Sequence, residues 1–322
     1  MQYQIQHLLP QVEAAIGRLQ LPQQPVSLYD PIRYFLELPG KRIRPVFVLQ
    51  CLELFRAPSA QDADAALSTE LFHNFSLVHD DIMDRAELRR GFPTVHIKWN
   101  EPTALLAGDA LLVLAYDALM KADVSELSEL IKRFNAMALA VCEGQQLDMD
   151  FSNLEKVSLS RYQEMIDRKT AALIAFSFEL GGFLGGADAG TRQNLFHFGM
   201  AMGRCFQLRD DYLDLFGDET KTGKVRGGDI GNSKLTQPVL FSMDHEKGAD
   251  FLKLWNLDPE TQKERTPKIL KWMEVHAIPQ ICETKLREEM EKGMDLLARI
   301  PGKEVARAQI RELCTALAFR ER

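Results

Sequence analysis

Cysteine is scarce in this sequence, and its five cysteines are far apart, with no CxxC spacing among them. A zinc site of the usual cysteine spacing and a disulfide framework are therefore not expected. Basic residues are not in excess either, because 39 lysines and arginines stand against 46 aspartates and glutamates, a net charge of −7. Binding a polyanion needs a clustered cationic surface, so we expect no nucleic-acid partner.

A long uncharged apolar run is also missing. The most apolar stretch, from Thr103 to Met120, is interrupted by Asp109 and Asp117, whereas a helix that crosses a bilayer needs about 20 mostly uncharged residues. We predict a buried core helix here and no membrane span. The first ten residues lack the basic patch and apolar segment of a signal peptide, so the expected location is cytoplasmic.

Runs of β-branched residues with alternating polarity are few, while apolar residues recur at helical spacing through most of the chain. This pattern favours an all-α fold. No Pro/Ser-rich linker or compositional break divides the chain, which indicates a single domain over residues 1–322, built as one large helix bundle.

Local signals indicate where long helices begin and end. Asn100, which precedes Glu101 and Pro102, predicts a helix start. Glycines predict three interruptions, at Gly91 with Pro93, at Gly181 with Gly182, and at Gly185 with Gly186.

The segment from Gly217 to Thr236 interrupts the helical pattern with five glycines and four basic residues. It is not a phosphate-binding P-loop, because five residues separate Gly217 from Gly223 where four are required, and Val225 follows Lys224 where Ser or Thr belongs. Loops of this length are usually functional or disordered. We expect a mobile lid that brings lysines to an anion.

The strongest pattern is an acidic motif, DDxxD, that occurs twice, 130 residues apart. On a helix, the first and last aspartates of such a motif lie about 40° apart and one turn from each other, so their carboxylates form a chelating pair. Apolar residues flank both motifs, which argues against two solvated helix ends. The motifs consist of Asp80, Asp81 and Asp84, and of Asp210, Asp211 and Asp214.

Six carboxylates facing one another across a helix bundle would repel strongly in a poorly solvated space, so we expect a cation between them. Oxygen ligands without histidine or cysteine favour Mg²⁺, which readily bridges protein carboxylates and substrate phosphates. The predicted ligand set is therefore magnesium with a phosphorylated substrate.

Basic residues occur in otherwise apolar segments, where arginine and lysine are suited to hold phosphate oxygens. The three sets are Lys41 with Arg42 and Arg44, Arg89 with Arg90, and Arg168 with Lys169. His73 lies two helical turns before Asp80 on the same face, where an anion contact and a structural role are equally open. Gln207 shares the face of the second motif.

These motifs, taken together, resemble the trans-isoprenyl diphosphate synthases, also called polyprenyl synthetases. The resemblance is carried by GKRIRP from Gly40 to Pro45, SLVHDDIMDRAELRRGFPTVH from Ser76 to His96, RKTAAL from Arg168 to Leu173, FQLRDDYLD from Phe206 to Asp214, and GK and GD at Gly223 and Gly228. It implies a single-domain fold of antiparallel helices around a deep central cavity, usually in a homodimer. The implied reaction condenses an allylic diphosphate (dimethylallyl, geranyl or farnesyl) head-to-tail with isopentenyl diphosphate.

The resemblance also implies residue roles. A magnesium site of about three ions, with Asp80, Asp84, Asp210 and Asp214 as ligands, would complete the two motifs that also contain Asp81 and Asp211. Contacts to the allylic diphosphate match Arg89, Lys169, Lys224 and Lys234, and contacts to isopentenyl diphosphate match Gly40, Lys41, Arg44, His73 and Arg90. Thr170 and Gln207 would lie beside the nascent carbocation, and Arg320 with Arg322 weakly resembles a basic tail that closes over the site.

Product length is expected to depend on side chains that precede Asp80. Phe75 lies about 7.5 Å and Phe72 about 12 Å down the helix axis, and the small Ser76 falls near the carboxylate face. An aromatic residue five positions before the motif, with a small residue four before it, resembles short-chain enzymes that stop at C20 geranylgeranyl diphosphate. We predict C20, with C15 farnesyl diphosphate as the alternative, and either ring could equally serve core packing.

Two other functions fit the sequence less well. A class I terpene cyclase would share the fold and the first motif. At the position of the second motif, however, a cyclase is expected to have an Asn/Ser/Glu-type motif in place of DDYLD. A regulatory subunit is disfavoured because all six motif aspartates are intact.

Overall fold

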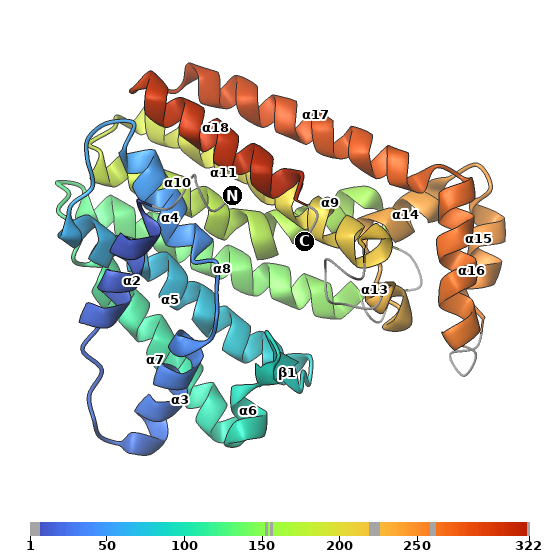
Figure 1. The fold of residues 1–322 in the computed structure, drawn as a ribbon, viewed down its shortest axis with the longest axis horizontal. Coiled ribbons are helices and arrows are strands. Elements are labelled where there is room, and N and C mark those ends of the chain that lie inside the picture. Colours follow the sequence, from blue (N-terminus) through green and yellow to red (C-terminus); the bar gives the residue numbers. More distant parts are fainter. Residues whose placement is uncertain (1–6, 152–153, 155–156, 219–225, 258–261, 321–322) are drawn as a thin grey trace. The chain divides into compact units, whose positions relative to one another are not determined.

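The computed structural model describes residues 7–151, 154, 157–218, 226–257 and 262–320. The chain forms two compact units. The first comprises Met1–Phe134, Phe176–Gln193 and Pro301–Ile310, and the second comprises Asn135–Ala175, Asn194–Ile300 and Arg311–Arg322. Both are built almost entirely from helices (Figure 1), which confirms the all-α class. A single domain over residues 1–322 stays a prediction.

The first unit is organised around two long helices that pack along each other, α5 (Ala60–Met83) and α7 (Glu101–Leu119). α5 also packs against α2 and α4, and α7 against α3 and α6. The shorter helices are α2 (Leu9–Arg18), α3 (Val26–Glu37), α4 (Ile43–Leu52) and α6 (Val95–Lys98). A small hairpin, β1 (Leu88–Arg89) with β2 (Phe92–Pro93), follows α5. The predicted interruption at Gly91 is therefore a strand turn.

Local capping explains where the two long helices begin. Ser59 and Asp62 form a capping box, in which the Asp62 amide donates to Ser59 Oγ and the Ser59 amide donates to Asp62 Oδ2 at 2.8 Å. Asn100 Oδ1 accepts from the Thr103 amide at 2.8 Å. The helix start predicted at Asn100 is thus confirmed.

The predicted helix end at Gly181 is wrong, because α10 (Ala172–Leu184) continues through it. A Cβ atom at Gly181 would lie 2.5 Å from the carbonyl oxygen of Val48. The glycine therefore allows a close approach of α10 to α4 and does not end the helix. α10 ends at Leu184, just before the second predicted pair, where Gly186 has a φ of +70°.

The apolar stretch predicted as a buried core helix forms α7, but only part of it is buried. Leu106, Val113 and Met120 are each about 60% exposed. Within the described residues, α7 is the one helix long and apolar enough, by length and composition alone, to cross a membrane, and 39% of that window is buried. Its buried side packs along α5.

The second unit contains α9 (Leu159–Ile166), a π-helical turn η1 (Asp167–Ala171), α13 (Gly228–Gly231), α14 (Gln237–Asp244), α15 (Gly248–Trp255), α16 (Gln262–Val275) and α17 (Ile278–Arg299). α14, α15, α16 and α17 pack in sequence against one another (Figure 1). Four helices contain residues of both units, namely α8 (Leu127–Phe151), α10, α11 (Ala189–Phe216) and α18 (Glu304–Ala318).

Candidate active site

The first acidic motif occupies the C-terminal end of α5. Asp80 and Asp81 lie in the last turn and Asp84 caps the helix, with its amide bonded to the Asp80 carbonyl at 2.8 Å. The outer aspartates are thus one helical turn apart, as predicted. A helix C-terminus carries partial negative charge, so three acids there are unfavourable unless cations lie nearby.

The three aspartates of this motif differ in exposure. Asp81 is 1% exposed and its Oδ1 accepts from Arg89 Nε at 2.7 Å, with Arg89 Nη2 at 2.6 Å. Burial raises the pKa of Asp81, and the bond from Arg89 partly opposes that rise. Asp80 is partly exposed and Asp84 is exposed. The middle aspartate therefore anchors the helix end, while the outer two are accessible.

The hairpin after α5 carries both predicted arginines. Its two turn residues, Arg90 and Gly91, have φ of +55° and +85°, the two-residue arrangement that suits a tight hairpin. A Cβ atom on Gly40 would lie 2.8 Å from Arg90 Nη1. The turn therefore brings the Arg90 guanidinium onto the backbone that precedes α4.

Arg42 holds that backbone in place. It adopts a left-handed conformation, with φ of +45°, at the start of α4 and is only 5% exposed. Its guanidinium donates to Glu70 Oε1 at 2.9 Å and to the Leu38 carbonyl at 3.3 Å, and it also bonds the Leu36 carbonyl. Arg42 is thus an anchor between α4 and α5, and the predicted substrate residues lie on either side of it.

His73 lies within a cluster of arginines. Burial, followed by the charges of the arginines around it, holds the pKa of His73 well below its usual value, so the imidazole is neutral near pH 7. The arginines that act on His73 are Arg44, Arg90, Arg89 and Arg42. We call the set of Arg42, Arg44, His73, Arg89 and Arg90 the basic cluster. Such a concentration of guanidinium groups attracts an anion.

The second acidic motif lies near the C-terminal end of α11. Its middle residue, Asp211, is 3% exposed and accepts from Tyr162 Oη at 2.6 Å, from Gln207 Nε2 at 2.8 Å and from the Gln237 amide at 3.3 Å. Burial raises the pKa of Asp211, and these donors partly offset the rise. The partners of Asp211 are neutral, whereas the partner of Asp81 is an arginine.

The outer aspartates of this motif make different contacts. Asp210 has a side chain that is 59% exposed, and its Oδ1 contacts the guanidinium of Arg320. The Arg320 carbonyl in turn accepts from Arg209 Nε at 2.7 Å. Asp214 Oδ2 accepts from the amide of Asp229, at the first turn of α13, at 2.9 Å. The chain end and the described end of the predicted lid both contact this motif.

Lys169 and Thr170 belong to the turn η1. Lys169 Nζ lies 2.5 Å from Asp148 Oδ2, and Thr170 Oγ1 donates to Gln207 Oε1 at 2.9 Å. The structure therefore brings Thr170, Gln207 and Asp211 into one chain of hydrogen bonds. Lys234 is exposed, and its charge acts to lower the pKa of Asp211. Lys224 lies outside the described residues, so the closing loop stays a prediction.

Residues predicted to set product length lie in the first unit. Phe72 is fully buried, and its ring packs edge-on against Phe75 at 5.4 Å and Phe134 at 5.6 Å. The Phe75 ring lies 4.9 Å from that of His79. Ser76 donates to the His73 carbonyl at 2.9 Å. The rings are packed together, and either could limit the space beside α5.

Several contact residues had no signal in the sequence. Tyr162 and Asp148 hold Asp211 and Lys169, yet they lie 49 and 21 residues away from them along the chain. Glu70 precedes Asp80 by almost three turns, and only its burial with Arg42 reveals its role. Partners of this kind follow from the fold rather than from a local pattern.

The two motifs differ from a metal site in one respect. Among the described residues, no three His, Cys, Asp or Glu side chains are gathered closely enough to hold a metal ion. The donor chemistry of the outer aspartates nevertheless fits Mg²⁺, since they offer accessible carboxylate oxygens. In the second motif a cationic guanidinium, that of Arg320, contacts one of them, as a metal ion would.

Comparison with known proteins identifies the family. The sequence model described as Polyprenyl synthetase matches residues 25–273. A geranylgeranyl diphosphate synthase of Methanosarcina mazei is 36% identical over 297 residues, which cover 91% of this chain and 90% of that protein. The chain belongs to the polyprenyl synthetase family. The predicted prenyltransferase activity is thereby confirmed, and the family is metal-dependent.

Further polyprenyl synthetases agree with this assignment. A (2E,6E)-farnesyl diphosphate synthase of Mycobacterium bovis is 34% identical over 292 residues, which cover 88% of this chain and 80% of that protein. The solved structure of a geranylgeranyl pyrophosphate synthetase from Pyrococcus horikoshii superposes with a TM-score of 0.87 and 31% identity, covering 99% of this chain and 98% of that one. The all-α fold is that of the family.

Proposed function

We propose that this polyprenyl synthetase condenses an allylic diphosphate head-to-tail with isopentenyl diphosphate in a Mg²⁺-dependent reaction that stops at C20 geranylgeranyl diphosphate. The observation that carries the proposal is the arrangement shared by the two acidic motifs. In each motif the middle aspartate is buried on protein partners and the outer two are more exposed. Outer carboxylates one turn apart suit a divalent ion, while the buried one fixes the helix that presents them.

The basic cluster supports a site for the diphosphate of isopentenyl diphosphate. Guanidinium groups and a neutral histidine offer several N–H donors to phosphate oxygens, and Gly40, which has no side chain, leaves room beside Arg90. The residues assigned to this diphosphate are Gly40, Lys41, Arg44, His73 and Arg90. Arg42, buried on Glu70, would position them.

The allylic diphosphate is assigned to a second group of cations, Arg89, Lys169, Lys224 and Lys234. Arg89 and Lys169 each already pair with an aspartate, Asp81 and Asp148, so their charges are held in place before substrate binds. Such preorganised cations stabilise charge that develops on a leaving diphosphate. Mg²⁺ bound by Asp80, Asp84, Asp210 and Asp214, in about three ions, would supply further neutralisation.

The remaining chemistry needs no protein nucleophile. When the allylic C–O bond breaks, its electron pair leaves with diphosphate, and the double bond of isopentenyl diphosphate attacks the carbocation. A proton then passes to the departed diphosphate, and the product is longer by one C5 unit. Thr170 and Gln207 present oxygen atoms that stabilise the positive charge, and their mutual hydrogen bond of 2.9 Å fixes their direction.

Product length is proposed from the side chains beside α5. Phe75, five residues before Asp80, is followed by the small Ser76, and Phe72 packs behind Phe75. A relative named for a C20 product and one named for a C15 product both match this chain over most of its length. The single aromatic residue next to a small one favours C20.

Incubation with labelled isopentenyl diphosphate and each allylic starter, followed by chromatography, tests this function. We expect chiefly C20 from dimethylallyl, geranyl and farnesyl diphosphates with Mg²⁺, and longer products from Phe72→Ala or Phe75→Ala if that ring ends the cavity. Chiefly C15, or C30 and longer, would overturn the product assignment. Consumption of allylic diphosphate alone would indicate a cyclase, and no turnover would indicate a regulatory subunit.

A homodimer is proposed from the exposed face of α7. Leu106, Val113 and Met120 recur every seven residues and are each about 60% exposed, a spacing that suits packing against the same helix of a second copy. Sedimentation velocity should show a dimer for the wild type and a monomer for a Leu106→Glu, Val113→Glu variant. A monomeric wild type would contradict it.

The expected location of the enzyme is the cytoplasm.

A further inference from the structure

The π-helical turn η1 carries two of the proposed allylic-site residues, Lys169 and Thr170. A π turn is wider than an α turn and is uncommon, and it often occurs at functional sites. The direction of every side chain within it depends on the wider geometry being maintained. Something outside the turn must therefore hold it.

Two glycines leave room for the backbone of this turn. A Cβ atom on Gly144 of α8 would lie 2.2 Å from the Lys169 nitrogen, and one on Gly203 of α11 would lie 2.4 Å from the Ala171 Cα. The turn is thus in close contact with two helices. Close packing therefore limits the position of the turn.

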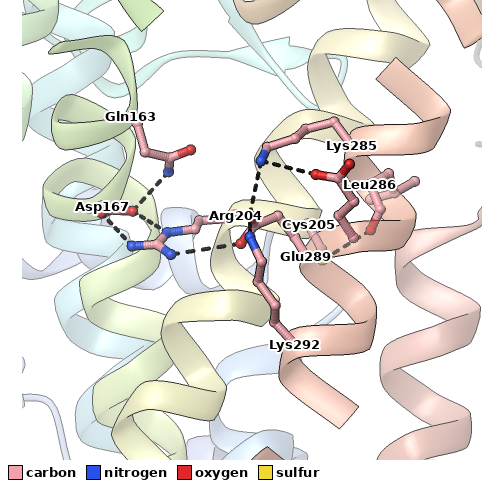
Figure 2. Close-up of polar contacts among 9 residues, drawn as sticks. Gln163, Asp167, Arg204, Cys205, Lys285, Leu286, Glu289 and Lys292 are labelled. Carbon is pink, nitrogen blue, oxygen red and sulfur yellow. Dashed lines mark hydrogen bonds and ion pairs between the residues drawn. The ribbon is translucent and has the colours of Figure 1, made fainter. Parts of the chain in front are cut away.

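A pair of charged side chains links the turn to α11. Asp167, the first residue of η1, accepts two parallel bonds from Arg204 of α11, from Nε at 2.6 Å and from Nη2 at 2.7 Å. Gln163 donates to the same carboxylate at 2.9 Å. Figure 2 shows the guanidinium facing the carboxylate edge-on. A bidentate pair of this kind fixes orientation as well as distance.

Arg204 is itself held from the other side. Glu289 of α17 is 5% exposed, and its Oε2 lies 3.7 Å from Arg204 Nη1. The other oxygen, Glu289 Oε1, accepts from Lys292 Nζ at 2.8 Å and lies 3.3 Å from Lys285 Nζ (Figure 2). The hydrogen bond to Asp167 raises the pKa of Arg204. The guanidinium therefore stays charged and has little freedom to turn away.

The spacing of the contacts connects this pair to the proposed site. Asp167 and Thr170 are three residues apart on η1, and their partners Arg204 and Gln207 are three residues apart on α11. The two links thus lie one turn apart along the same pair of elements, and the second continues to Asp211. Together they define one register of η1 against α11.

We propose that Asp167 and Arg204 are positioning residues, whose bidentate pairing fixes the register of the π turn and so directs Lys169 toward the allylic diphosphate and Thr170 toward the carbocation formed from it. The inference rests on the proposed function, which gives Lys169 and Thr170 these roles. The two side chains are 24% and 32% exposed, and ion pairs with such exposure contribute little to global stability. Loss of this pair should therefore change the kinetic constants and leave the stability of the fold nearly unchanged.

Arg204→Lys tests the pair, because lysine keeps the charge but cannot make two parallel bonds. We expect kcat/KM for the allylic diphosphate to fall about 10- to 100-fold, with KM for isopentenyl diphosphate and the melting temperature nearly unchanged. Asp167→Asn should lose a similar amount, and the double variant should lose no more than either single variant.

Arg56→Lys is the matched control. Arg56 makes an equal bidentate pair with Asp62, at 2.7 Å for both bonds, in the first unit. This variant should retain wild-type kinetics. Amide hydrogen exchange, measured without substrate, should accelerate over residues 167–171 in Arg204→Lys and not in Arg56→Lys.

Lys169→Ala separates this inference from the proposed function. If Lys169→Ala loses allylic turnover while Arg204→Lys matches the wild type in kinetics and exchange, the positioning role is overturned and the proposed function stands. If Lys169→Ala is fully active, the assignment of Lys169 is wrong, and so is the inference built on it. Equal losses for both substrates, together with a lower melting temperature, would indicate a purely structural pair.

Discussion

The two acidic motifs share three aspartates at the same spacing, yet their buried middle aspartates are stabilised by different kinds of partner. Asp81 pairs with one cation, Arg89, whereas Asp211 is surrounded by three neutral donors, including Tyr162 and Gln207. An ion pair neutralises a buried carboxylate, and neutral donors solvate it without removing its charge. The pattern therefore specifies a buried anchor between two accessible ligands, and the surrounding fold decides how that anchor is stabilised.

The surroundings of the two motifs also differ. The first motif lies beside the basic cluster, in which four arginines act on His73, while the second contacts the described end of the Gly217–Thr236 segment and the chain end. In the proposed function the basic cluster supplies the cations for isopentenyl diphosphate, whereas Lys169 and Lys234 of the second unit serve the allylic diphosphate.

The largest effect should come from the outer aspartates, where the motifs are expected to behave alike. Asp80→Asn and Asp210→Asn should each lower kcat by about 10²- to 10³-fold, because each removes a charged carboxylate proposed as a metal ligand. Mg²⁺ binding measured by calorimetry should weaken in both, with melting temperatures retained. The exposed Asp250→Asn provides a control. Near-native turnover in either variant would end the assignment of that motif to metal.

The middle aspartates should separate the motifs. Asp211→Asn leaves at least one of three donors without its acceptor, at a cost of about 1–3 kcal/mol in the free energy of unfolding. Asp81→Asn should cost about 0–1 kcal/mol, because Arg89 is 27% exposed and can turn to water. Urea unfolding of both variants measures the difference. Equal costs would mean that the two anchors are equivalent after all.

The sequence was sufficient for features that depend on local chemistry. Charged residues inside apolar segments, such as Asp80 or Arg89, are visible without a structure, because burying them requires a partner or a function. Helical periodicity predicted the all-α class, and Asn100 predicted a helix start that its capping bond confirms. These signals lie within a few residues of the feature they predict.

Features that depend on contacts between distant segments were not predictable. The π turn is accommodated by Gly144 and Gly203, which lie 25 and 34 residues from Lys169, and no pattern within Asp167–Ala171 announces it. The helix end predicted at Gly181 was wrong for the same reason, since that glycine serves an approach to Val48. A glycine can end a helix or admit a neighbour, and only the neighbour distinguishes these roles.

The free energy of unfolding should depend on pH through His73, which belongs to the basic cluster beside the first motif. Its pKa is well below the ordinary value when folded, so below about pH 6.5 the unfolded chain binds a proton that the folded chain does not. The free energy of unfolding should therefore fall as pH decreases through that range, by about 1 kcal/mol between pH 6.5 and 5.5. His73→Gln should remove this part of the slope.

Exposed His197→Gln, in the second unit, is the control for that experiment. The measurement is urea unfolding at pH 7.5, 6.5 and 5.5 for the wild type and both variants. A slope that persists in His73→Gln would show that other groups account for the dependence. A wild type that becomes more stable as pH falls would contradict the neutral state of His73 directly.

The smallest expected effect concerns Arg320, whose guanidinium contacts the outer aspartate Asp210. If Arg320 occupies an oxygen that Mg²⁺ needs, Arg320→Ala should lower the Mg²⁺ concentration for half-maximal activity by about two- to five-fold, the range for an ion pair with one exposed partner. Arg311→Ala, which changes an exposed arginine of α18, the helix that ends just before Arg320, should leave it unchanged. A higher Mg²⁺ requirement in Arg320→Ala would instead mean that the chain end supports the bound state, and the second motif would then resemble the first in having a cation that assists substrate binding.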